Sequence, residues 1–192
     1  MPIAGKQYAA QALPLTLTFI NIVNNLDSNE TVTIEDSDGT KTLEFLNKCR
    51  IIGRKMNSND SGSLGLHPAV YFYSREGRHK PVSFYAITSL MMDFNKNKDL
   101  TNNFIKVRGK FEEILIEYDY LIPQITRKYR KGIDSYINIK NFYLGLINNL
   151  QNSITKSEAV NKLISSQFDY LKINQNPVNS ESIEKFYKIK SG

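Results

Sequence analysis

The segment PVSFYAITSLMMDF, residues 81–94, decides the fold that the sequence predicts. Its large apolar side chains recur at steps of three or four residues, which places them on one side of a helix: Phe84, Ile87, Met91 and Phe94. Pro81 stands where the first helical residue would be, a position at which the missing N–H has no partner within the helix anyway. The segment therefore predicts an amphipathic helix that begins at a proline.

A second proline-led segment, PAVYFYS, lies just upstream at residues 68–74. It is too short for its periodicity to decide between helix and strand, and we favour a helix because Pro68 again suits a helix start. The residues between the two segments, SREGRHK at 74–80, predict a short turn around Gly77. The aromatic run at 71–73 is expected to pack mostly in the core.

Helical spacing continues outward in both directions. Further helices are predicted at 13–26, 42–56, 104–120, 122–132, 134–150, 155–171 and 181–190. Thr155 and Glu158 have capping-box spacing, and Gly132 is a typical helix stop. The segment TVTIE, residues 31–35, could instead form a short strand. The sequence thus predicts an all-α bundle of about seven or eight helices with short loops, as a helical domain at 1–175 followed by a linker and short helix at 176–192.

The composition fits a globular domain with its own core, since 41% of the 192 residues are hydrophobic and 23% are charged. The single cysteine, Cys49, cannot form an internal disulfide, which favours a reducing compartment, and we expect it to be a small buried residue. The N-terminal 25 residues lack the clean apolar centre of a signal peptide or membrane span. A cytoplasmic protein that does not contact a membrane is expected.

The net charge of +6 favours an acidic partner. Two basic clusters are the candidate nucleic-acid contacts, one formed by Arg75, Arg78, His79 and Lys80 and the other by Arg127, Lys128, Tyr129, Arg130 and Lys131. Arg50, Arg54 and Lys55 form a third basic set. Cationic side chains beside an aromatic ring suit phosphate contacts with base stacking. The alternative is that these clusters are only solvated, solubilising charges.

The sequence shows no complete catalytic or metal motif. A zinc site needs about four ligands, and the sequence around His67 and His79 does not provide them. The pair Glu113 and Glu117 shares one helix face and could hold a cation, but a solvated surface face explains it as well. The stretch DSDG, residues 36–39, starts like a calcium loop but lacks the later ligands. We therefore predict no catalytic residue, no metal and no cofactor.

The stretch SLGLHPAVYFYSREGRHKPVSFYAI, residues 63–87, resembles the helical C-terminal part of bacterial proteins that carry an N-terminal ParB/sulfiredoxin-like domain, of the modification-dependent restriction or phage-defence class. The residues that match are Leu64, Gly65, Leu66, His67, Pro68, Ala69, Val70, Tyr71, Phe72, Tyr73, Gly77 and Pro81. The resemblance covers half to two thirds of the chain.

The DGQxR-type signature of that class is missing here, because Asp38 and Gly39 are followed by Thr40 and Lys41. The resemblance therefore implies a helical portion without the catalytic domain, either a fragment or a stand-alone relative. It implies a bacterial, cytosolic chain linked to nucleic acid, to DNA more than to RNA. Two hypotheses follow: a nucleic-acid-associated accessory domain, or a scaffold that docks a separate nuclease or other partner subunit. A third, an enzyme in its own right, would rest on His67, His79, Glu113 and Glu117.

Overall fold

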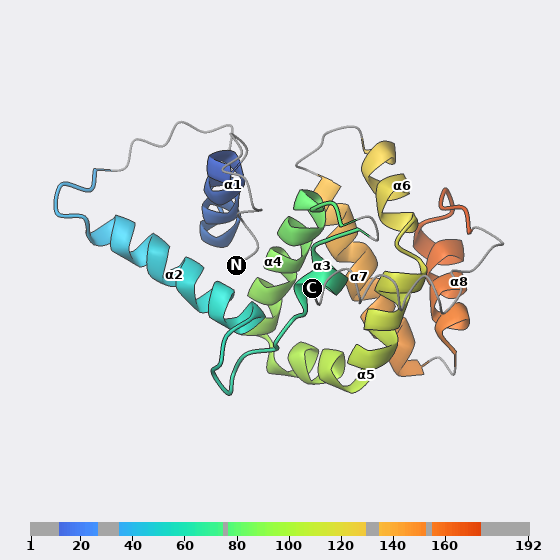
Figure 1. The fold of residues 1–192 in the computed structure, drawn as a ribbon. Coiled ribbons are helices and arrows are strands. Elements are labelled where there is room, and N and C mark those ends of the chain that lie inside the picture. The colour runs from blue at the N-terminus through green and yellow to red at the C-terminus, as the bar shows by residue number, and fades with distance from the viewer. Residues whose placement is uncertain (1–11, 27–34, 75–76, 130–134, 153–154, 174–192) are drawn as a thin grey trace.

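The computed structural model describes residues 12–26, 35–74, 77–129, 135–152 and 155–173 (Figure 1). Within these ranges the chain forms eight helices: α1 Ala12–Asn24, α2 Thr40–Met56, α3 Pro68–Tyr71, α4 Pro81–Lys96, α5 Lys98–Glu117, α6 Leu121–Lys128, α7 Ser135–Asn152 and α8 Lys156–Gln167. The prediction of an all-α bundle of about seven or eight helices is confirmed. The possible strand at 31–35 apart from Glu35, the stop at Gly132 and the predicted region 176–192 lie outside the described residues.

Helix α4 is the centre of the bundle. It packs against α7 and α5 on one side and against α1 and α2 on the other, as Figure 1 shows. The predicted face of α4 is buried, but so are residues on its other sides, including Tyr85, Leu90 and Met92. The buried face of α4 is therefore wider than its spacing predicts, because five other helices pack against it. Burial of this kind stabilises a fold by about 25 cal/mol per Å² of apolar surface.

Helix α7 is the centre of the larger part of the body, where α5, α6 and α8 pack against it (Figure 1). Gly145 of α7 faces Leu163 of α8, and a Cβ added at Gly145 would lie 2.4 Å from Leu163 Cδ1. The glycine thus lets the two helices approach closely. The predicted capping box is confirmed, since Thr155 accepts from the Glu158 backbone N–H while the Glu158 side chain accepts from the Thr155 N–H.

Helix α2 begins at two aspartates. The Asp36 carboxylate accepts hydrogen bonds from the backbone N–H groups of Lys41 and Thr42 at 2.8 and 2.9 Å, and Asp38 accepts from the Thr40 N–H at 3.0 Å. These bonds lower the pKa of both carboxyl groups, with the Thr42 hydroxyl the largest cause at Asp36. The DSDG stretch is therefore a helix cap, in which carboxylates satisfy N–H groups that lack partners within the helix.

Arg108 of α5 anchors the segment that leads into α3. Its guanidinium donates to the carbonyl oxygens of Leu64 and Gly65, at 2.5 and 3.1 Å, and to Glu112 Oε1 at 2.7 Å. Glu112 Oε1 also accepts from the hydroxyl of Tyr71, at 2.8 Å, and Tyr71 is only 1% exposed. The distinctive stretch at 64–71 is thus bound to α5 by a polar network that the sequence did not reveal.

Candidate functional site

The turn between α3 and α4 is compact. Tyr73 and His79 form an antiparallel bridge, and the Ser74 N–H donates to the Arg78 carbonyl at 2.8 Å. Gly77 has a positive φ of 77°, in the left-handed region that favours glycine. The predicted turn around Gly77 and the two proline-led helix starts at Pro68 and Pro81 are confirmed.

His79 lies in an aromatic environment within this turn. Its ring centroid lies 5.5 Å from that of Tyr73 and 6.3 Å from that of Phe84. Its Nε2 is buried without a hydrogen-bond partner, and burial lowers the pKa of the imidazole. The ring of His79 therefore packs against the start of α4, and burial favours its neutral form, which does not suit a phosphate contact.

The cations of the turn differ in how they are used. Lys80 Nζ lies 2.5 Å from Asp119 Oδ1, so this ammonium is engaged within the fold. Arg78 is also described and is exposed, so its guanidinium can contact a phosphate. Arg75 lies outside the described residues.

The second predicted cluster sits at the end of α6. Lys128 Nζ lies 5.3 Å from the ring centroid of Tyr170, and the Tyr129 ring lies 6.2 Å from the same ring. Arg127 Nε donates to the Pro123 carbonyl of its own helix at 3.2 Å. Lys128 and Tyr129 thus help to hold the segment after α8 against α6. Arg130 and Lys131 lie outside the described residues.

Three of the four residues of the enzyme hypothesis, Glu113, Glu117 and His79, make contacts within the fold. Lys156 Nζ lies 2.7 Å from Glu113 Oε2 and 2.5 Å from Glu117 Oε1, so one ammonium of α8 holds both carboxylates of α5. His67 is exposed before α3 and makes no side-chain cap there. No group of three or more His, Cys, Asp or Glu suited to a metal ion occurs among the described residues.

The third basic set lies on α2, and this helix concentrates the charge of the chain. It carries five cations, Lys41, Lys48, Arg50, Arg54 and Lys55, and one acid, Glu44. The helix therefore has a net charge of +4, against +6 for the whole chain. Its first half is mostly exposed and extends beyond the body of the bundle (Figure 1). The sequence singles out Arg50, Arg54 and Lys55 only as a third basic set, after the clusters at 75–80 and 127–131.

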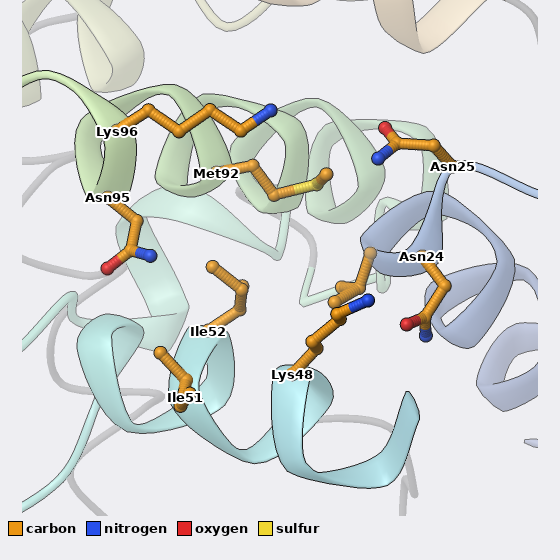
Figure 2. A pocket seen from close by; sticks show the side chains of 9 residues that line it. Asn24, Asn25, Lys48, Ile51, Ile52, Met92, Asn95 and Lys96 are labelled. Carbon is orange, nitrogen blue, oxygen red and sulfur yellow. The ribbon is translucent and has the colours of Figure 1, made fainter. Parts of the chain in front are cut away.

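Two adjoining hollows run along α2. The first, with a volume of about 240 Å³, lies between α1, α2 and α4 (Figure 2) and is lined by Val23, Asn24, Asn25, Lys48, Ile51, Ile52, Met92, Asn95 and Lys96. The second, of about 410 Å³, is lined by Ile51, Arg54, Lys55, Asp60, Gly62, Ser63 and Asn95. Because Ile51 and Asn95 line both, the two hollows form one groove beside α2, called here the α2 groove.

The polar groups of the α2 groove are mostly cations and amides. Arg54 is paired with Asp60 through bonds of 2.6 and 3.0 Å, and Lys55 Nζ donates to the Phe94 carbonyl at 3.3 Å. Burial lowers the pKa of Lys55. Lys48 pairs with Glu44 at 2.7 Å, but both side chains are about half exposed, so solvent screens this pair. The groove can therefore receive an anionic ligand.

Asn24 and Cys49 lie beside the first hollow. Asn24 Nδ2 donates to the Ile20 carbonyl at 2.9 Å and lies 3.8 Å from Cys49 Sγ, while its Oδ1 is buried without a partner. Cys49 is buried and free, and burial raises the pKa of its thiol. The prediction that Cys49 is a small buried residue is confirmed, and burial makes its reactive thiolate scarce.

Helices α1 and α2 also expose large apolar side chains. Leu13 and Leu17 of α1 are 66% and 51% exposed, and Leu43 and Leu46 of α2 are 69% and 50% exposed. Leucines at such spacing lie along one side of each helix. In the part of the chain that the structure describes, no helix is both long and apolar enough to cross a membrane.

Comparisons of the chain with protein-family models, with curated proteins and with solved structures found no match.

Proposed function

We propose that this chain is a non-catalytic helical module that binds nucleic acid through helix α2 and the α2 groove. The observation that carries the proposal is the net charge of +4 on α2 beside a groove lined by Lys48, Lys96, Arg54 and Lys55. Exposed Lys and Arg side chains contact phosphates and release condensed counterions, which is the main source of sequence-independent affinity.

The exposure of the cations on α2 supports this role. Lys41, Lys48 and Arg50 are exposed, so they can reach a phosphate backbone without any change in the bundle. By contrast, Lys80 is only 17% exposed and is paired with Asp119, whereas the pair of Lys48 with Glu44 is about half exposed. The contact surface that we propose is therefore centred on α2, with Arg78 as an additional contact from the turn.

The preference for DNA over RNA, and a role as an accessory part of a bacterial restriction or phage-defence protein, rest on the resemblance of residues 63–87 to that class. A non-catalytic role is supported by the engagement of Glu113 and Glu117 with Lys156. Such a module would position nucleic acid for a nuclease encoded elsewhere.

The experiment is a binding titration of labelled duplex and single-stranded DNA at about 50 and about 200 mM salt. Affinity should fall steeply with salt. The double variant Lys48→Ala/Arg50→Ala should weaken binding, while Lys162→Ala, which removes an exposed lysine from α8, serves as the control. Absence of binding at the lower salt concentration would refute the proposal.

A second candidate function is docking of a partner protein, and the exposed leucines of α1 and α2 favour it. Apolar side chains that are half or more exposed mark interaction surfaces when they gather together. Because α2 is also strongly basic, the partner that we propose presents an acidic surface with apolar side chains. Leu43→Glu/Leu46→Glu should abolish association with such a partner and leave DNA affinity unchanged or weaker, whereas Lys48→Ala/Arg50→Ala should weaken both.

A further inference from the structure

The first hollow of the α2 groove combines an apolar floor with polar edges. Ile52 and Met92 lie between the two helices that face each other across it, while Lys48 projects from α2 toward α1 and Lys96 extends along α4 (Figure 2). Asn24 and Asn25 close the end formed by α1. An apolar floor accepts the face of a flat ring, and amides at the edge can pair with its polar atoms.

The charge of this hollow selects an anion. Its nine lining residues include Lys48 and Lys96 but no aspartate or glutamate. Both lysines are exposed and can move onto a bound group. An ammonium on a flexible stem is a common partner of phosphate.

The three asparagines restrict the class of anion further. Asn25 and Asn95 are exposed and offer both donors and acceptors, whereas Asn24 donates to the Ile20 carbonyl and has only its buried Oδ1 without a partner. An acyl chain would cover these amides and leave their hydrogen bonds unmade, which costs free energy. A heterocycle with amide-like edges would pair with them instead.

The sizes of the two hollows suit a ligand made of repeated units, with one unit in the first hollow and the next unit toward the second. The first, at about 240 Å³, falls below the range of about 300–1,000 Å³ for drug-sized ligands. The second hollow brings Arg54 and Lys55 to the far side of Ile51 and Asn95. A ring in the first hollow would therefore have cations on both sides for its phosphates.

We propose that the hollow between α1, α2 and α4 binds a single nucleotide, with the base on Ile52 and Met92, its edges on the asparagine amides and its phosphate on Lys48 or Lys96. In a longer strand the next phosphate lies toward Arg54 and Lys55. This inference rests on the proposed function and specifies where one unit of the nucleic acid is held.

The test is titration of the isotope-labelled chain with 5′-AMP, 5′-dTMP and inorganic phosphate, followed by NMR. The methyl signals of Ile52 and Met92 should shift with the mononucleotides and not with phosphate alone. Ile51→Trp, which adds bulk where the two hollows meet, should abolish these shifts. Ile105→Trp is its control, since Ile51 and Ile105 are 43% and 53% exposed and lie on the helices α2 and α5.

A second variant changes chemistry without adding bulk. Asn95→Leu should lower mononucleotide affinity by about fivefold, as expected for one lost hydrogen bond. Asn102→Leu replaces another exposed asparagine, on α5, and should leave the affinity unchanged. Circular dichroism verifies that each variant is folded.

The outcomes separate this inference from the proposed function. If the mononucleotides produce no shifts beyond those of phosphate, or if Ile51→Trp leaves their binding intact, the nucleotide site is refuted, even where DNA binding persists. If mononucleotides bind and Ile51→Trp blocks them while DNA does not bind, the site stands and the proposed function fails.

Discussion

Lys80 and Asp119 form an ion pair in which Nζ lies 2.5 Å from Oδ1 and each side chain is only 17% exposed. Lys80 directly precedes α4, and Asp119 lies between α5 and α6. The pair therefore ties the start of the central helix to the junction of two others. A lysine that the sequence suggests as a phosphate contact is thus a link within the fold.

Lys80→Ala should lower the free energy of unfolding by about 1–3 kcal/mol, because it leaves a mostly buried carboxylate without its partner. Urea unfolding followed by circular dichroism measures this. Lys106→Ala removes an exposed lysine from α5 and should change stability by no more than about 0.5 kcal/mol. An unchanged stability for Lys80→Ala with weaker DNA binding would show that Lys80 contacts phosphate after all.

Arg78→Ala should behave in the opposite way. Arg78 is exposed, so its removal should change stability by no more than about 0.5 kcal/mol. If it contacts a phosphate, the affinity should fall about equally for all DNA sequences, and the salt slope should drop by roughly one unit. A clear loss of stability with unchanged DNA affinity would show that the turn is purely structural.

Arg108→Ala should destabilise the chain by about 2–3 kcal/mol, because it removes charge-assisted bonds to the Leu64 and Gly65 carbonyls and to Glu112. For a chain of this size that corresponds to a fall in melting temperature of about 4–12 °C. Tyr71→Phe removes only the hydroxyl group that donates a hydrogen bond to Glu112, and it should lower the free energy of unfolding by about 1 kcal/mol. Equal stability of Arg108→Ala and the wild type would contradict this role of the network.

His79 gives the stability a defined dependence on pH. Burial lowers its pKa in the folded chain below the ordinary value of 6.5, so the unfolded chain binds more protons between the two values. The contribution of the neutral ring is therefore present above pH 6.5 and is lost as the pH falls from 6.5 toward the folded pKa.

His79→Phe keeps a ring against Tyr73 and Phe84 but removes the titrating group, so this part of the acid sensitivity should disappear. His67→Gln, a change at the exposed histidine before α3, should retain it. Melting temperatures measured across this pH range decide the matter. If His79→Phe and the wild type lose stability in parallel on acidification, the burial of His79 has no such effect.

Local sequence signals predicted the helices well, because prolines, capping residues and apolar spacing act over a few residues. Pro68, Pro81 and the Thr155–Glu158 box are each found where expected. The burial of α4 beyond its predicted face was not predictable from its periodicity, because it depends on five neighbouring helices at once.

The candidate site was harder to predict, because a charge in the sequence does not reveal its partner in the fold. Lys80 meets Asp119 from 39 residues away, and Lys156 meets Glu117 from the same separation. The α2 groove joins residues from α1, α2 and α4, which no local pattern connects. The one available signal was the density of cations on α2.

The central claim is that α2 contacts a phosphate backbone, and the salt dependence of DNA affinity tests it most directly. The logarithm of the association constant should fall linearly with the logarithm of salt concentration, and Lys48→Ala/Arg50→Ala should reduce the slope by about 1.8 for duplex DNA, at about 0.9 for each lost contact. Lys162→Ala should keep the wild-type slope. A wild-type affinity that does not change with salt, or a slope that is the same in both variants, would contradict the claim.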